Sequence, residues 1–438
     1  MENSDWLKRK YLEYINDQLY FGGIRTTDLT NQYGTPIYVI SEELIRDRYR
    51  VLKKVISKEY VNNRIHYSVK ANTNIAVLKI LESEGASVDC VSTGEIHLCL
   101  IAGFSPERIV YTSNNITNDE LRYALEKRVI INLDHGSQLL RLIKIADELG
   151  INPKFISFRV NPEIGGGYHD HCITAGRNVK FGILEEDIVE AYKLAIENGF
   201  TNFGIHMHIG SGILEILTFK KSTEKFLSIV KKVQQETNIQ FDFINFGGGL
   251  GIPYKPSENP LNLNEFSATV LSMYKSAIED MGLDNPTFCI EPGRFLTAEA
   301  SIILVEVNTI KKTKDKNFVG TNGGFNILIR PTMYDSYHHI INCNKKNRDN
   351  LIQADIVGQI CESGDVIGRD RNIIEPEEND FLAILDTGAY GFSMGSIYNS
   401  RPRPAEILIN KGKSHVARET GSFYDLERSQ HIPDYLKK

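Results

Sequence analysis

The chain has 438 residues, of which 41% are hydrophobic and 24% charged, and its formal net charge is −6. These values are ordinary for a globular protein with a large core, and they argue against a nucleic acid or a membrane surface as an electrostatic partner. No apolar run approaches the roughly 18 residues that span a bilayer, and the N-terminal MENSDWLKRKYLEY lacks the apolar core of a signal peptide.

The first 40 residues combine a polar stretch, which predicts a helix, with a short strand at 34–40 entered through a proline turn. From there to about residue 298, strand-like and helical patterns alternate. Strand-like runs occur at 65–70, 86–92, 108–113, 129–134, 154–161, 202–209, 241–248 and 287–293. Helical patterns between them include 137–150, 185–199 and 221–237.

Eight strands alternating with helices predict an α/β fold, a (β/α)8 TIM-type barrel. A doubly wound sheet is disfavoured because no GxGxxG motif follows an early strand. After residue 298 the pattern changes to short strands separated by Gly, Asn and Asp turns, which predicts a second, all-β domain. We therefore expect a barrel over 41–298 and a β domain, sandwich-like or barrel-like, made of 1–40 and 299–438.

The strand ends of the predicted barrel carry reactive side chains. In this fold the C-terminal strand ends form the active face, so these side chains are expected to converge. They are Lys70, Ser92, Asp134, Asn161, His208, the glycines 247–249, Glu291 and Arg294. A lone lysine at a strand end is usually a solvated loop residue, so the surrounding motifs must show whether Lys70 is functional.

Two glycine-containing motifs favour an anion site at this face. In HMHIGSG, a buried strand histidine such as His206 is expected to be an ordinary core residue. His208 is the better candidate, because Gly210, Ser211 and Gly212 follow it in a turn that can bind an anion. In NFGGGLG at 245–251, the glycines let the backbone approach a ligand, most often a phosphate.

The motif YSVKAN around Lys70 resembles the cofactor lysine motif of the pyridoxal-phosphate decarboxylases of the alanine-racemase fold (group IV). That family holds diaminopimelate, ornithine and arginine decarboxylases. Further motifs match in the family's order, namely EPGR at 291–294, CESGD at 361–365 and DTGAYGFSMGSIYNSRPRP at 386–404. IRPTMYDSYHHI at 329–340 narrows the resemblance to the diaminopimelate decarboxylases.

This resemblance implies pyridoxal 5′-phosphate as the cofactor, bound through the amine of Lys70. It implies catalytic roles for Lys70, Cys361, Glu291 and His208. Implied cofactor contacts are Lys70, Asp89, His208, Ser211, Gly248, Gly249, Glu291, Gly293, Arg294 and Tyr390. Implied substrate contacts are Arg294, Arg330, Tyr334, Glu362 and Tyr390, and no metal is implied.

Glu291 indicates the kind of reaction. A carboxylate facing the pyridine nitrogen favours the protonated ring, which is a strong electron sink. Racemases of this fold place an arginine there, so Glu291 favours decarboxylation. Read without the family, EPGR is equally consistent with an ion pair on a surface turn.

The six cysteines contain no CxxC pair, which excludes an obvious zinc site and fits a reducing cytoplasm. By resemblance, Cys361 is the proton donor and enters the site from a partner subunit together with Glu362. The other cysteines are expected to be small buried hydrophobes. They are Cys90, Cys99, Cys172, Cys289 and Cys343.

The resemblance implies a cytoplasmic homodimer with shared active sites that binds neither nucleic acid nor membrane. The reaction that the resemblance implies is the decarboxylation of meso-2,6-diaminopimelate to L-lysine and CO2, the last step of lysine biosynthesis. The alternative is a decarboxylase of another amino acid, such as ornithine, lysine, a D-amino acid or a carboxylated polyamine precursor. A catalytically inactive homologue that regulates a partner decarboxylase is disfavoured, because Lys70 and Cys361 are both present. A pyridoxal-phosphate carrier, which usually consists of a barrel alone, is disfavoured by the predicted β domain. Departures from the family pattern lie at Gly212, Asn322, Ile327 and 161–183.

Overall fold

The structure, a computed structural model, describes residues 9–167, 174–176, 178–344 and 350–437. The chain divides into two compact units. The barrel unit comprises Ile45–Pro253 and Ser257–Thr297, and the β unit comprises Met1–Leu44, Tyr254–Pro256 and Ala298–Lys438.

Eight parallel strands of the barrel unit close on themselves in the order β11, β13, β14, β5, β6, β7, β8, β9. Their bounds are β5 (Asn63–Ser68), β6 (Ser87–Cys90), β7 (Ile109–Ser113), β8 (Ile130–Leu133), β9 (Phe155–Val160), β11 (Asn202–Met207), β13 (Phe243–Asn245) and β14 (Thr287–Ile290). Each overlaps one predicted strand, so the predicted (β/α)8 barrel is confirmed. Beyond these strands, β10 (Gly166–Gly167) pairs with β12 (Gly210–Ser211).

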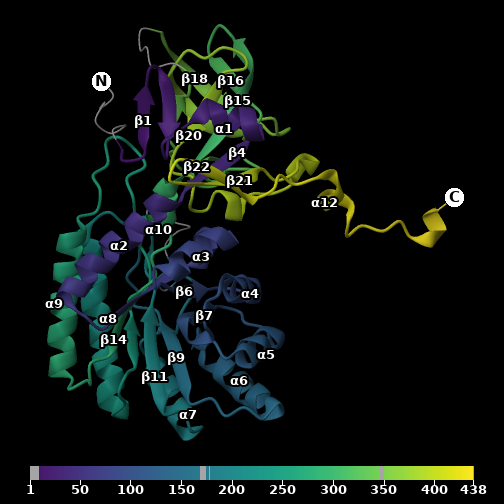
Figure 1. The fold of residues 1–438 in the computed structure, drawn as a ribbon. Helices are drawn as coiled ribbons and strands as arrows, with labels where there is room; N and C mark the ends of the chain where they lie inside the picture. The colour runs from purple at the N-terminus through teal and green to yellow at the C-terminus, as the bar shows by residue number, and fades with distance from the viewer. Residues whose placement is uncertain (1–8, 168–173, 177, 345–349, 438) are drawn as a thin grey trace. The chain divides into compact units, whose positions relative to one another are not determined.

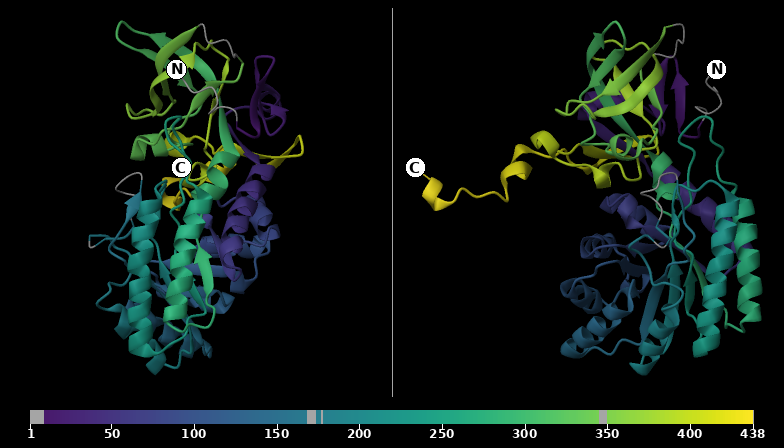
Figure 2. Two further views of the ribbon diagram at one scale, coloured as in Figure 1. Left: turned by 90° about the vertical axis from the view of Figure 1, so that its left-hand side faces the viewer. Right: turned by 180° about the vertical axis from the view of Figure 1, so that it is seen from behind.

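Helices surround the barrel strands (Figure 1). Their bounds are α2 (Glu42–Glu59), α3 (Ile75–Ser83), α4 (Thr93–Ala102), α5 (Asn118–Lys127), α6 (Gly136–Leu149), α7 (Ile188–Glu197), α8 (Ile216–Thr237), α9 (Leu263–Asp280) and α10 (Arg294–Thr297). The long helices α8 and α9 lie side by side (Figure 2). Helix α8 begins before the predicted residue 221, because Phe219 belongs to its first turn and packs on Phe266 of α9 with ring centroids 4.9 Å apart.

The β unit is mostly strand, as predicted. Its main sheet has the order β19, β18, β16, β15, β4, β21, β22, and β20 pairs with both β15 and β17. The bounds are β4 (Ile37–Ser41), β15 (Ser301–Lys312), β16 (Asn317–Thr321), β17 (Ile340–Asn342), β18 (Leu351–Val357), β19 (Val366–Ile374), β20 (Phe381–Ile384), β21 (Ala405–Asn410) and β22 (Lys413–Arg418). Short helices are α1 (Thr26–Tyr33), α11 (Arg330–Tyr334) and α12 (Phe423–Glu427).

Strand β4 lies inside this sheet, antiparallel to β15 and parallel to β21. Ile37 and Val39 pack into one apolar cluster of the β unit, and Tyr38 packs into another. Because both faces of β4 are buried, its sequence IYVIS shows no polar alternation.

The helical start predicted for the first residues is wrong for residues 9–25, and residues 1–8 lie outside the described residues. Described residues there form a three-stranded sheet of β1 (Leu12–Ile15), β2 (Gln18–Phe21) and β3 (Ile24–Arg25). Asn16 and Asp17, with φ of 47° and 61°, and Gly22 and Gly23, with φ of 59° and 79°, make two-residue turns. Such residue pairs are the preferred hairpin turns, a signal that the polar composition obscured.

In the part of the chain that the structure describes, no helix has the length and apolar character needed to cross a membrane.

Candidate active site

Lys70 lies just beyond the end of a barrel strand. Strand β5 ends at Ser68, and a 3-10 turn (Val69–Ala71) carries Lys70. Three residues after this turn, the Asn74 side chain accepts a hydrogen bond from Ala76 N and caps α3. The amine of Lys70 lies 2.9 Å from Oδ2 of Asp89 on β6, and the lysine side chain remains about one-third exposed, at 32%.

Asp89 is a buried carboxylate beside this amine. Burial raises the pKa of Asp89, the negative charge of Glu291 adds to the effect, and Lys70 opposes both. Its Oδ1 is buried and has no hydrogen-bond partner among the residues that the structure describes. A second polar group from a ligand at Lys70 would satisfy that oxygen.

Glu291 follows β14 and is buried within the barrel unit. Its Oε1 accepts a hydrogen bond from Asn245 Nδ2 at 2.7 Å, and its Oε2 lies 3.0 Å from His206 Nε2. Burial alone would raise the pKa of Glu291, but His206, Lys70 and His208 hold it well below its usual range. The site therefore contains an ionised carboxylate that can stabilise a neighbouring positive charge.

His208 presents a neutral ring to this group. Burial first, and then the positive charges of Lys70 and Arg159, hold the pKa of His208 well below its ordinary value. The hydroxyl of Thr174 lies 2.7 Å from His208 Nδ1 and fixes the ring. A neutral imidazole suits the role of covering an aromatic cofactor ring.

Polar groups that can bind an anion lie at Ser211, Arg294 and the glycine turn at 247–249. The buried Arg294 donates from Nη2 to Ser211 Oγ at 3.1 Å. A Cβ at Gly247, whose φ is +67°, would lie 2.1 Å from the carbonyl oxygen of Met207. A Cβ at Gly248 would lie 2.6 Å from the carbonyl oxygen of Glu291, so only glycines fit this close approach.

The residues of the barrel unit thus fit pyridoxal phosphate. They offer an amine at Lys70, a carboxylate at Glu291, a neutral ring at His208 and an anion cradle at Ser211 with Arg294. Gly293 adjoins this group, since a Cβ there would meet Ser68 and Ala71 at 3.1 Å. Among the described residues, no cluster of His, Cys, Asp or Glu is arranged to hold a metal ion.

Three other predicted strand-end residues make hydrogen bonds to the backbone of neighbouring segments. Ser92 caps α4 by accepting a hydrogen bond from Glu95 N. Asp134 accepts one from Gly182 N at 2.9 Å. Asn161 donates to the carbonyl oxygens of Gly176 and Phe181.

The β unit positions a second group of predicted residues. Cys361 is exposed, whereas the other described cysteines are buried; Cys172 lies outside the described residues. Asn399 binds Cys361 twice, accepting from its backbone N–H at 3.1 Å and donating to its Sγ at 3.2 Å. Glu362 accepts a hydrogen bond from the hydroxyl of Tyr398 at 2.8 Å.

Arg330 and Tyr334 lie one helical turn apart on α11. Arg330 is almost fully buried, its Nη1 donates to Nε2 of His338 at 2.7 Å, and its guanidinium lies 4.7 Å from the ring centroid of Tyr254. Tyr390 is partly buried and has a φ of +60°.

The departures from the family pattern have local structural roles. Asn322 accepts a hydrogen bond from Glu306 N at 3.0 Å and donates to Thr35 Oγ1 at 2.8 Å. Ile327 packs in an apolar cluster of the β unit. Gly212 has a φ of +79°, a conformation that favours glycine.

Sequence reasoning missed His206 and Asn245, which hold Glu291. The sequence shows His206 near the end of a strand, two residues before His208, but not that its side chain meets Glu291. Asn245 is the last residue of β13 and lies two residues before Gly247.

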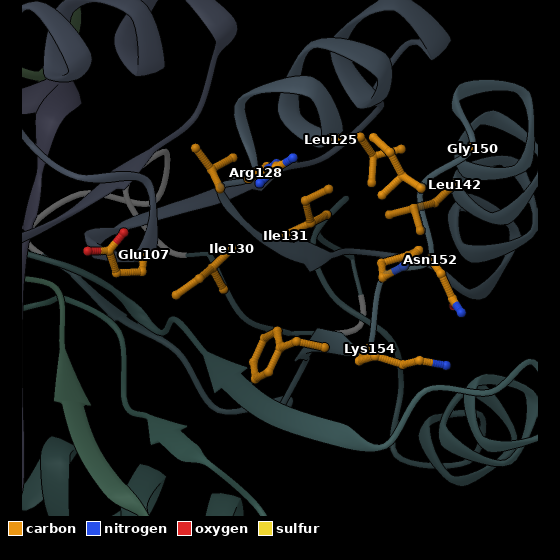
Figure 3. Close-up of a pocket in the computed structure, with 13 residues that line it drawn as sticks. Glu107, Leu125, Arg128, Ile130, Ile131, Leu142, Gly150, Asn152 and Lys154 are labelled. Carbon is orange, nitrogen blue, oxygen red and sulfur yellow. The ribbon is translucent and has the colours of Figure 1, made fainter.

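A separate cavity of about 480 Å³ opens at the other rim of the barrel (Figure 3). It is lined by the starts of β8 and β9, with apolar side chains such as Ile131 and Leu142 beside Arg128 and Lys154. Lys70 follows a strand end, so this cavity is not part of the candidate active site.

Comparisons with known proteins agree with this geometry. A family model described as "Pyridoxal-dependent decarboxylase, pyridoxal binding domain" matches residues 43–298. The chain is 49% identical to a diaminopimelate decarboxylase of Methanothermobacter thermautotrophicus, over 97% of this chain and 98% of that protein. It is 36% identical to that of Archaeoglobus fulgidus, over 94% and 97%. The crystal structure of the M. jannaschii enzyme in complex with L-lysine matches with a TM-score of 0.91 and 33% identity, covering 98% of this chain and 99% of that one.

Proposed function

The chain belongs to the diaminopimelate decarboxylases, and from this membership we infer the reaction that it catalyses. It is a pyridoxal-phosphate-dependent carboxy-lyase that converts meso-2,6-diaminopimelate to L-lysine and CO2, the last step of lysine biosynthesis. The observation that carries this function is the buried, ionised Glu291, which shares the strand-end face of the barrel with Lys70.

We propose a separate role in cofactor binding for each site residue of the barrel unit. When bound, pyridoxal phosphate supplies an electron-poor ring that accepts the electron pair left by a departing carboxylate. Lys70 would hold the cofactor through its amine, and the ionised Glu291 would stabilise a proton on the ring nitrogen. The phosphate would be held by Ser211, Gly248, Gly249, Gly293 and Arg294. Asp89 would orient Lys70, and the neutral His208 would contact the ring.

Recognition of the substrate's distal end is proposed for Arg330. The far end of diaminopimelate carries a second carboxylate, and an arginine fork pairs with a carboxylate through two parallel hydrogen bonds. The contacts of Arg330 with His338 and Tyr254 support this role, because they fix the guanidinium before a substrate arrives. Tyr334, Glu362, Tyr390 and Arg294 complete the proposed substrate contacts.

We further propose a homodimer in which Cys361 and Glu362 enter the partner's active site and Cys361 donates the proton. In support, Cys361 is exposed, and the C-terminal segment exposes Phe423 at 79% and Tyr435 at 84%. Exposed apolar side chains of this size are typical of a surface that a partner covers.

We propose a domain division at 41–298 for cofactor binding, with 1–40 and 299–438 forming the β domain. We also propose a cytoplasmic location without a nucleic-acid partner. The free thiols of the described cysteines and the net charge of −6 support these last two assignments.

A direct test measures CO2 release from a panel of amino acids. We expect turnover of meso-diaminopimelate and none of ornithine or lysine. Borohydride should attach the cofactor covalently to wild-type protein at Lys70 and leave the Lys70→Ala variant unlabelled. Turnover of ornithine or lysine in place of diaminopimelate would show that the substrate assignment is wrong. Labelling of a peptide without Lys70 would show that the cofactor assignment is wrong.

A further inference from the structure

We propose that His206, oriented by Asn132, is a positioning residue that holds Glu291 ionised and directed at the ring nitrogen of the cofactor. The inference rests on the proposed role of Glu291 and extends it to a deeper layer of the barrel. Its basis is a continuous chain of buried hydrogen bonds that crosses the barrel interior.

His206 lies on β11 and is 1% exposed, and Glu291, which follows β14, is 2% exposed. Nε2 of His206 lies 3.0 Å from Oε2 of Glu291, and Asn245 donates to the other carboxylate oxygen at 2.7 Å. Each oxygen therefore has one protein partner. A carboxylate has about four acceptor positions, so Glu291 can still accept a hydrogen bond from a ligand.

Asn132 on β8 determines which nitrogen of His206 carries the proton. Its Oδ1 accepts a hydrogen bond from Ser157 Oγ at 2.7 Å, which leaves its amide nitrogen facing Thr112 Oγ1 at 3.2 Å and His206 Nδ1 at 3.1 Å. An amide nitrogen only donates, so Nδ1 accepts and the imidazole proton lies on Nε2, toward Glu291.

A purely structural role for His206 would be satisfied by any polar partner in the core. The arrangement here is directional, because Ser157, Asn132 and His206 each donate to the next group and the series ends on Glu291. A buried carboxylate that loses such a donor tends to become protonated. A protonated Glu291 could no longer stabilise a protonated ring nitrogen.

The test uses holoenzyme reconstituted with pyridoxal phosphate labelled with ¹⁵N in the ring, whose NMR shift reports protonation of that nitrogen. We expect His206→Leu to lower the pH at which the ring nitrogen loses its proton by about one to two units, the shift for loss of one hydrogen bond to a charged group. His206→Gln keeps an N–H donor, so the pH at which the ring nitrogen loses its proton should stay close to the wild-type value. His206→Asn, whose amide is too short to reach Glu291, should behave like His206→Leu.

His66→Leu is the matched control, because His66 is another buried barrel histidine, on β5. Burial lowers the pKa of His66 to about 4 against the opposing charge of Glu291, so its ring is neutral near pH 7 and brings no charge to the site. We expect it to leave the ring-nitrogen titration unchanged. An unchanged titration in both His206→Leu and His206→Asn overturns the proposal. Equal shifts in His66→Leu and His206→Leu also overturn it, since they reflect barrel packing.

Glu291→Gln separates this proposal from the function on which it rests. It should abolish ring protonation altogether. If it does not, the role assigned to Glu291 is wrong and the role of His206 falls with it. If Glu291→Gln abolishes protonation and the His206 variants do not shift it, only the His206 proposal fails.

Discussion

Glu95 is a carboxyl group whose ionisation opposes folding. It lies in the first turn of α4, where Oε2 accepts a hydrogen bond from Val91 N at 2.8 Å. Burial raises the pKa of Glu95 to about 7, and Asp89 adds to the rise, against the Val91 hydrogen bond and the charge of Lys70. The folded protein therefore binds a proton here that the unfolded chain has already lost near pH 6.

This gives a pH-dependent prediction. A raised carboxyl pKa stabilises the folded state below about pH 4.5 relative to higher pH, and stability is lost as the pH rises through about 7. Glu95→Gln should therefore gain stability over wild type between pH 5.5 and 8.5, by about 2 kcal/mol after allowance for partial solvent exposure. Urea unfolding of the holoenzyme variants at both pH values measures the gain. A constant difference between the two proteins across this range would contradict the raised pKa.

Among single residues, sequence motifs located some of the candidate site residues and missed others. Lys70, His208 and Glu291 each end or follow a strand within a recognisable motif, so their positions could be read from the sequence. The partners of Glu291 could not, because His206, Asn245 and Glu291 lie on or follow different strands. Which side chains meet across a barrel depends on the register of strands that are far apart in sequence.

Among the elements, the barrel strands and helices were predictable and the N-terminal hairpins were not. Strand-like runs that alternate with helical patterns identified all eight barrel strands. Strands β1 and β2 are four residues each, too short for a pattern to stand out. Their turns, Asn16–Asp17 and Gly22–Gly23, carried the only usable signal.

Helix α11 gives a prediction about specificity. Arg330 is proposed to pair with the distal carboxylate of the substrate, and breaking a desolvated charge pair costs about 3–5 kcal/mol. Arg330→Met should therefore lower kcat/KM for meso-diaminopimelate by roughly two to four decades, measured by CO2 release. Cofactor binding, followed by absorbance, should be unchanged because the proposed cofactor contacts of the barrel unit are intact.

Arg371 provides a matched control in the same unit, since its guanidinium lies 3.8 Å from the ring centroid of Tyr337. Arg371→Met loses a comparable cation–aromatic contact and should leave kcat/KM within a few-fold of wild type. Equal losses in the two variants would indicate that Arg330 acts through the stability of the β unit.

For the whole molecule, the proposed shared site predicts complementation between inactive variants. Lys70→Ala and Cys361→Ala should each be inactive alone. A heterodimer of the two assembles one intact site, so equal mixing should restore about a quarter of wild-type activity per subunit. Two affinity tags on the two variants allow the heterodimer to be purified and assayed. Purified heterodimers without activity would show that each site is built within one subunit.

The pairing of strand β4 has a consequence for how the chain is synthesised. Residues 37–41 emerge from the ribosome early, but their neighbours β15 and β21 begin only at Ser301 and Ala405. The whole barrel is made in between. A nascent chain that stops before residue 405 leaves one edge of this apolar strand open, and such an edge is a template for aggregation. Strand β21, which is made after the whole barrel, therefore shields a strand that is made before it.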